Sequence, residues 1–186
     1  MDSCDLVFVH RYGWMLRGLM HAKIKTREQL RDILGERPRE KKTILAHGHF
    51  DIVHPGHLLH LRYAKSKADI LIASVTTDNH IEKGMYRPHV PEDLRAMNLA
   101  ELEMVDYVMI DNNATPLETI KALQPDYFAR GYEYSDWGTP KTVLEAEALK
   151  EYGGEIIFTP GDVVYSSSKL IALSRPSLRD EKLISL

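Results

Sequence analysis

Apolar residues recur along this chain in short continuous runs, and the stretches between the runs carry apolar positions at helical spacing. Such runs, bounded by glycine, proline and polar residues, are typical of buried strands. Alternation of strands with helices favours an α/β fold with right-handed connections, a Rossmann-like three-layer sandwich around a central parallel sheet. We expect about five strands, near residues 43–47, 69–75, 105–110, 126–130 and 154–158.

Two helix starts are marked by capping residues. The stretch 26–34 has helical spacing, and Thr26 with Gln29 has the sequence of a capping box. Before the fourth strand, we expect Thr115 as the N-cap of a helix and Pro116 at its first helical position.

The pattern divides the chain into three parts. Residues 1–25 carry apolar runs that are too short to span a membrane, and we interpret them as an N-terminal extension that packs on a partner subunit or forms a flexible tail. Residues 26–174 form the one predicted domain, and residues 175–186 read as a polar C-terminal tail or linker.

Composition narrows the class of protein. A hydrophobic share of 44% and a charged share of 27% in 186 residues are ordinary for one soluble globular domain. The net charge of −3 does not indicate a nucleic-acid surface. The single cysteine, Cys4, excludes an internal disulfide and fits a reducing compartment. We therefore expect a cytoplasmic protein without nucleic-acid or membrane partners.

The most informative segment, GHFDIVHPGH over residues 48–57, joins the first predicted strand to a helix. Gly56 is expected at the helix N-terminus, where unpaired N–H groups and the helix dipole favour an anion. His54 and His57 lie three positions apart, so both side chains can point at the same phosphate. The segment therefore predicts a phosphate-binding turn.

Two other interpretations of the histidines stay open. The turn can be a plain capped bend with solvent-exposed histidines. The density of histidines, five between His47 and His60, can also indicate a transition-metal site of a metal-dependent hydrolase. Against the metal site, His60 lies about 240° around an ideal helix from His54, and the chain has no CxxC pair.

The pattern G-x-F-D-x-x-H-x-G-H resembles the motif of the cytidylyltransferase-like nucleotidyltransferase superfamily. The resemblance implies that His54 and His57 are catalytic: they contact the nucleotide phosphates while a substrate phosphate oxygen attacks the α-phosphorus and pyrophosphate leaves. Such transfer depends on positioning and on donors aimed at the phosphate oxygens, which imidazoles provide. The nucleotide-binding residues implied in this segment are Gly48, His49, Phe50, Asp51 and Gly56.

A second block, beginning K-G-M-Y-R-P at Lys83, is similar to the K-G-x-x-R-P…R segment of the heptose-phosphate nucleotidyltransferase branch. The resemblance places catalytic Lys83 over the triphosphate. It adds Asp78 and Arg87 to the nucleotide-binding residues and makes Arg95 a substrate-binding residue. Without the histidine motif, this block can equally be a solvated basic loop.

The third block covers residues 125–134 and is similar to the branch's P-D-x-x-x-K-G-x-D-Y stretch. It implies Gly131 as a nucleotide-binding residue, and Arg130 and Tyr134 as substrate-binding residues. Arg130 stands where the branch has lysine, and Glu133 stands where it has aspartate. These replacements keep the charge but change the reach, so the acceptor stays open.

The last block places Ser166, Ser167 and Ser168 where the family has an S-T-S/T segment that binds the β- and γ-phosphates. Tyr165 replaces the usual glycine before it, and a serine run alone is often only a cap or linker. The four blocks follow the family's order between Lys42 and Ile171, which makes chance agreement improbable.

The sequence thus predicts a nucleotidyltransferase that moves a nucleoside monophosphate from CTP or ATP to a phosphate or phosphonate oxygen of a small polyol or sugar. The nearest relatives implied are heptose-1-phosphate adenylyltransferases and glycerol-phosphate cytidylyltransferases. We expect Mg²⁺ to arrive with the triphosphate, without a metal site built by protein ligands. We also expect a homodimer, and a place in a multidomain polypeptide. The alternative from another class is a non-catalytic nucleotide sensor.

Overall fold

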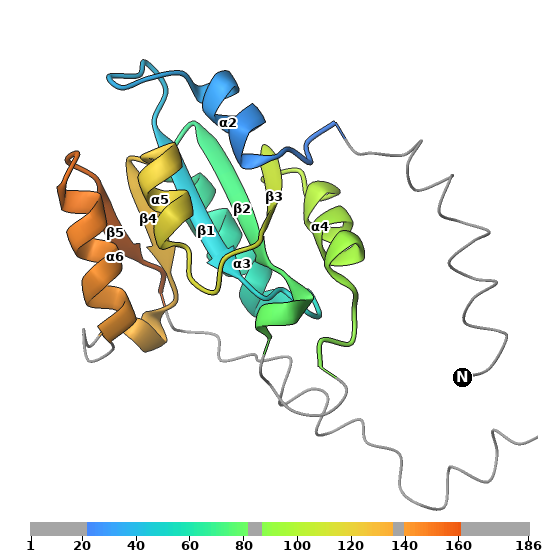
Figure 1. Ribbon diagram of the computed structural model, residues 1–186. Coiled ribbons are helices and arrows are strands. Elements are labelled where there is room, and N and C mark those ends of the chain that lie inside the picture. The colour runs from blue at the N-terminus through green and yellow to red at the C-terminus, as the bar shows by residue number, and fades with distance from the viewer. Residues whose placement is uncertain (1–21, 82–86, 136–139, 161–186) are drawn as a thin grey trace, which may run out of the picture.

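The computed structural model describes residues 22–81, 87–135 and 140–160, which form a parallel sheet between two layers of helices (Figure 1). The strand order is β3-β2-β1-β4-β5, and all neighbours pair in parallel. The predicted Rossmann-like fold is confirmed, and each strand lies within two residues of its predicted range. The strands are β1 (Thr43–Gly48), β2 (Ile70–Thr76), β3 (Tyr107–Asp111), β4 (Tyr127–Arg130) and β5 (Glu155–Phe158).

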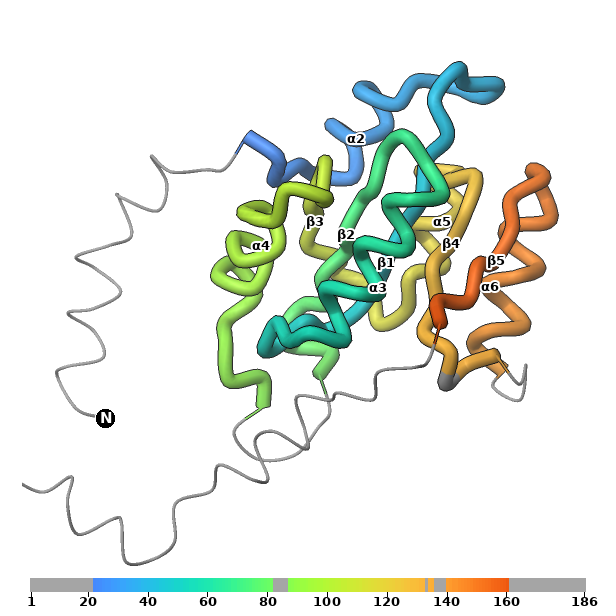
Figure 2. The backbone as a smooth tube through the Cα atoms, turned by 180° about the vertical axis from the view of Figure 1, so that it is seen from behind, coloured from blue at the N-terminus to red at the C-terminus, as the bar shows by residue number. Residues whose placement is uncertain are grey.

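Side chains of successive strand residues point to opposite faces of the sheet and pack in two separate hydrophobic cores. Ile44 and Ala46 of β1 face one helix layer, while Leu45 faces the other. The layer on the side of the sheet that Figure 2 shows contains α3 (Pro55–Lys65) and α4 (Glu92–Ala100). The opposite layer contains α2 (Arg27–Leu34), α5 (Leu117–Leu123) and α6 (Pro140–Lys150). None of the helices in the described ranges is long and apolar enough to cross a membrane.

The two predicted helix starts have different outcomes. The capping box of α2 is confirmed, because Gln29 N–H donates to Thr26 Oγ1 at 3.2 Å and Thr26 N–H donates to Gln29 Oε1 at 2.9 Å. The predicted start at Thr115 is wrong, since α5 begins at Leu117 with Pro116 as its N-cap. Pro116 has a ψ of 2°, which is not helical, although its carbonyl accepts the first helical hydrogen bond.

The sheet extends beyond β3 through the residues that precede α2. Ile24 forms a parallel bridge with Val108, with hydrogen bonds from Lys25 N–H to Val108 O and from Val108 N–H to Lys23 O, both 2.9 Å. The last residues of the predicted extension 1–25 therefore pair with the domain. Residues 1–21 lie outside the described part of the chain, so packing on a partner subunit stays a prediction.

The strand order places a topological switch beside β1. The chain adds β2 and β3 on one side of β1 and then returns to lay β4 on the other side. The carboxyl ends of all strands point to the lower edge of the sheet in Figure 1. Ligands of doubly wound sheets bind beyond this edge at the switch point. The histidine turn follows β1 there, and Arg130 is the last residue of β4.

Candidate functional site

The helix after β1 begins without a side-chain cap. His54 is the N-cap residue of α3, with extended backbone angles (φ −136°, ψ 169°), and its side chain makes no capping hydrogen bond. Pro55 follows at the first helical position and has no N–H group, and Gly56 lies in the first turn, as predicted. The positive end of the helix dipole therefore faces the switch point without an acidic residue in the first turn to offset it.

The structure brings the two motif histidines together. The rings of His54 and His57 are stacked, with centroids 3.8 Å apart and an interplanar angle of 24°. His54 is only 7% exposed, and its Nδ1 is buried without a hydrogen-bond partner among the described residues. Burial lowers the pKa of His54, so the ring is neutral at neutral pH. In a neutral imidazole one ring nitrogen carries a hydrogen and can donate a hydrogen bond, while the other can accept one.

Phe50 supports His57 from the side. Its ring meets the His57 ring edge-on, with centroids 5.1 Å apart. Phe50 is buried and has a φ of 49°, a left-handed conformation that costs a non-glycine residue about 1 kcal/mol. Gly48 leaves room for this ring, because a Cβ at Gly48 would lie 3.2 Å from Phe50 Cε2. These two motif residues therefore shape the turn.

Asp51 is buried and engages the loop before α4. One carboxylate oxygen accepts hydrogen bonds from the N–H groups of His89 and Val90, at 2.8 and 3.0 Å. The other oxygen lies 2.7 Å from Arg87 Nε. The sequence predicts nucleotide contacts for Asp51 and Arg87, whereas the structure pairs them with each other in a site where Asp51 is 2% exposed.

Arg95 has surroundings that differ from the prediction. The sequence predicts substrate contact, but the side chain is fully buried. Its Nε donates to Val90 O at 2.9 Å, and its Nη2 donates to Thr76 O at 2.7 Å and to Asp78 Oδ1 at 2.5 Å. Its Nη1 donates to the carbonyl of His49. The predicted nucleotide-binding residues Asp78 and His49 are thus tied to Arg95, and no face of the guanidinium is open to a substrate.

Arg130 lies at the carboxyl end of β4, next to β1. Its Nη2 lies 2.9 Å from Glu145 Oε2, and its guanidinium stacks over the Tyr134 ring at 4.3 Å. Arg130 Nε is buried without a hydrogen-bond partner among the described residues. Gly131 follows as the N-cap of the short helix η2 (Tyr132–Tyr134). Arg130, Gly131 and Tyr134 therefore lie together, with an unsatisfied donor among them.

Glu145 is the partner that the sequence did not indicate. It is 1% exposed on α6, and burial raises the pKa of its carboxyl group while Arg130 opposes that shift. No motif singles out this position.

For the burial of Arg95, in contrast, the sequence held a signal. Arg95 lies four residues before the buried Leu99, on the same face of the helix.

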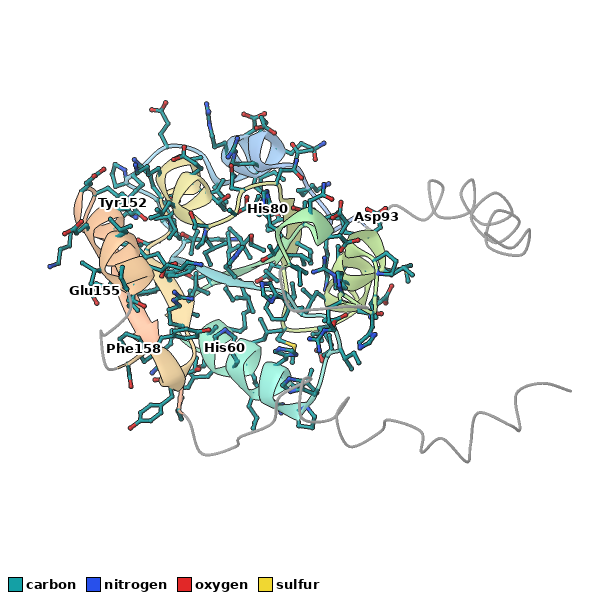
Figure 3. The ribbon with its side chains drawn as sticks, turned by 60° about the horizontal axis from the view of Figure 1, so that its bottom comes forward. His60, His80, Asp93, Tyr152, Glu155 and Phe158 are labelled. Atoms are coloured by element: carbon teal, nitrogen blue, oxygen red, sulfur yellow. The ribbon has the colours of Figure 1, made fainter. Side chains whose placement is uncertain are left out.

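The remaining histidines of the cluster have separate partners. His47 Nδ1 lies 3.0 Å from Ser74 Oγ, and its Nε2 lies 3.2 Å from Thr76 Oγ1. His60 points from α3 toward the end of β5 (Figure 3), where its Nδ1 lies 3.0 Å from Thr159 Oγ1. Within the described ranges, no three His, Cys, Asp or Glu side chains gather so as to hold a metal ion. His47 and His60 thus lie near different hydroxyl groups and do not share a ligand site.

Some predicted residues lie outside the described part of the chain, namely Lys83, Ser166, Ser167 and Ser168. Their roles stay predictions.

Comparison with known proteins decides the family. The sequence model of the cytidylyltransferase-like family matches residues 45–173, which is more than half of the chain and includes the histidine turn and Arg130. The chain belongs to the cytidylyltransferase-like family. The family predicted from the motifs is therefore confirmed.

Three relatives are 39% to 41% identical to this chain within the aligned regions. "Bifunctional protein HldE" of Syntrophotalea carbinolica is 39% identical over 73% of the chain, and that of Caulobacter vibrioides is 39% identical over 81%. "Bifunctional protein HldE" of Helicobacter pylori is 41% identical over 70%. The matched regions cover only 27%, 31% and 27% of these relatives, so the chain spans less than a third of their length.

Solved structures agree on the fold. The lipopolysaccharide core biosynthesis protein from Thermoplasma volcanium GSS1 superposes with a TM-score of 0.55 at 24% identity, over 64% of this chain and 97% of that one. Pantoate-beta-alanine ligase from Francisella tularensis superposes with a TM-score of 0.58 at 15% identity, over 87% and 76%. At this identity the likeness supports the Rossmann-like architecture of the cytidylyltransferase-like domain.

Proposed function

We propose that this chain is a nucleotidyltransferase that moves a nucleoside monophosphate from ATP or CTP to a phosphate or phosphonate oxygen of a small sugar or polyol. The observation that carries the proposal is the buried, unpartnered Nδ1 of His54 at the uncapped N-terminus of α3. A buried polar atom without a partner is costly, and a phosphate oxygen would satisfy it. Family membership supplies the reaction class.

The two histidines act in this scheme as donors to the transferring phosphorus. An oxygen of the acceptor forms the new bond to the α-phosphorus, and the bond to the bridging oxygen of the β-phosphate breaks, so pyrophosphate leaves with that electron pair. His54 and His57 donate hydrogen bonds to the oxygens that gain charge, and the α3 dipole adds to this stabilisation. Because burial keeps His54 neutral in the free protein, the bound phosphate supplies the negative charge that favours its protonated form.

Other groups are proposed to contact the remaining parts of the nucleoside triphosphate. Lys83 is proposed to contact the triphosphate, and Ser166 to Ser168 the leaving pyrophosphate, as the family resemblance implies. Mg²⁺ would offset charge on the triphosphate when bound. The carboxylate of Asp51 is already paired with Arg87, and that of Asp78 accepts from Arg95, so phosphate oxygens and water would provide most of the ligands for that ion.

Arg130 is the proposed contact for the acceptor's anionic group. Its unpartnered Nε lies at the end of β4, beside β1, and a guanidinium donor suits a phosphate or phosphonate oxygen. The resemblance of the motifs to the heptose-phosphate branch favours a sugar phosphate with ATP as donor. The replacement of lysine by Arg130 favours testing polyol phosphates with CTP as well.

Pyrophosphate release tests the proposal. The chain is incubated with Mg²⁺ and each of the four nucleoside triphosphates, against a panel of sugar phosphates, glycerol phosphates and hydroxyalkyl phosphonates. We expect release that requires one donor and one acceptor together. Nucleotide binding without release for any pair would support the sensor instead, and release without an acceptor would indicate hydrolysis.

A further inference from the structure

Two buried side chains of opposite charge hold the loop before α4 against the histidine turn. Asp51 accepts from the N–H of Val90 at 3.0 Å, while Arg95 donates to the carbonyl of Val90 at 2.9 Å. Both backbone groups of Val90 are thus fixed by charged side chains. Neither charge faces solvent, since Asp51 is 2% exposed and Arg95 is fully buried.

The same two residues also hold the backbone on both sides of Phe50. Arg95 Nη1 donates to the carbonyl of His49, directly before Phe50, and Asp51 follows it in the chain. Phe50 is the buried residue with a left-handed φ of 49°, a conformation that persists only where the surroundings impose it. Its ring contacts His57 edge-on. A chain of contacts therefore runs from Arg95 through the His49 carbonyl and Phe50 to His57.

The remaining bonds of Arg95 fix it to the sheet. Its Nη2 donates to the carbonyl of Thr76, the last residue of β2, and to Asp78 Oδ1. A planar guanidinium can make all four contacts at once because its donors point in fixed directions, whereas a lysine ammonium presents three donors on a flexible stem. The position therefore requires arginine for its geometry as well as its charge.

We propose that Arg95 is a positioning residue of the transfer reaction: it sets the backbone around Phe50 so that the rings of His57 and His54 keep their stacked arrangement. The inference rests on the proposed function for its link to turnover. Its structural part, the control of the histidine rings by a guanidinium that touches no substrate, stands independently of the reaction.

Arg95→Lys tests the inference through steady-state kinetics. We expect kcat to fall about 30- to 100-fold, the range for displaced catalytic groups, and KM for the acceptor to change by less than about threefold, since uniform binding is retained. Arg37→Lys is the matched control. Arg37 likewise bonds a carbonyl, of Gln124, and lies 3.2 Å from a carboxylate, of Asp126, near the opposite ends of the strands. We expect this control to keep its kcat.

A second readout does not depend on activity. In protein labelled with ¹⁵N-histidine, the ring resonances of His54 and His57 should move in Arg95→Lys, while those of His60, whose Nδ1 lies 3.0 Å from Thr159 Oγ1, stay in place. Unchanged rings and unchanged kcat in a folded, less stable variant would reduce Arg95 to a purely structural residue. A large rise in the acceptor KM with unchanged kcat would show substrate contact. If no substrate pair reacts at all, the ring resonances still decide the inference.

Discussion

At the scale of single residues, the histidines of this chain differ in how their ring nitrogens are satisfied. Both nitrogens of His47 lie within hydrogen-bond distance of hydroxyls, and His60 is joined to Thr159. His54 alone is 93% buried at a helix N-terminus with Nδ1 unpartnered among the described residues. The proposed phosphate binding by the motif pair rests on this nitrogen of His54, whereas His47 and His60 make contacts within the domain.

His57→Ala should lower turnover by about 100-fold or more, because it removes one donor to the developing charge. The measurement is the rate of pyrophosphate release at saturating substrates, with folding checked by circular dichroism. His60→Gln on the same helix is the control and should keep most of the turnover. Equal losses in both variants would contradict a specific role for His57.

His47 should make stability fall in mild acid. Burial lowers the pKa of His47 to about 4, below the value of about 6.5 in an unfolded chain. The unfolded chain therefore binds more protons between these two values, and the contribution of His47 is complete above about pH 6.5 and is lost as the pH falls towards 4. By pH 4 the loss should reach about 3 kcal/mol relative to neutral pH.

Urea unfolding of the wild type and His47→Gln from pH 7 to 4 checks this. Glutamine can keep a hydrogen bond to Ser74 or Thr76 without titrating, so between pH 7 and 4 the wild type should lose about 3 kcal/mol more stability than His47→Gln. Parallel curves would show that His47 does not titrate in this window.

The contacts of Arg95 are an example of what could not be predicted from the sequence. The motif predicted a substrate-binding role for Arg95, and its spacing to Leu99 put it on the buried face of α4. What it bonds depends on three segments that lie far apart in the sequence and meet only in the fold. Glu145 is a stronger case, because its ion pair with Arg130 has no local sequence signal at all.

At the scale of elements, the strands were the most predictable part. Strands buried between two helix layers are continuous apolar runs, and all five runs predicted strands within two residues. Helix starts were predictable where side chains cap them reciprocally, as in α2. The start of α5 was not, since both Thr115 and Pro116 suit a helix start and the choice depends on the turn after β3.

Thr26→Ala should destabilise the domain by about 1 kcal/mol, the usual cost of losing an N-cap side chain. The lost bond is the one from Gln29 N–H to Thr26 Oγ1. Thr26→Ser keeps the hydroxyl and should stay close to the wild type. Thermal unfolding of the three proteins compares them directly, and equal stabilities would show that the capping box contributes nothing measurable.

At the scale of the whole molecule, the strand order explains why motifs far apart in the sequence lie at neighbouring strand ends. The turn after β1 and the end of β4 are separated by about eighty positions, yet their strands are neighbours, with Ala46 opposite Ala129. The α/β class and the family followed from motif order, and the strand order explains where the motifs meet. The identity of the acceptor did not follow, because Arg130, its proposed contact, is oriented by Glu145 and Tyr134, which no motif links to it.

The most direct test of the account is the identity of the product. ³¹P NMR is recorded for the reaction of the active donor and acceptor, with His54→Ala in parallel. The account predicts free pyrophosphate and a pair of coupled resonances from a new link between nucleoside monophosphate and acceptor phosphate or phosphonate, both strongly reduced in the variant. Orthophosphate or free nucleoside monophosphate in place of the linked product, or the linked product at an undiminished rate in His54→Ala, would contradict it.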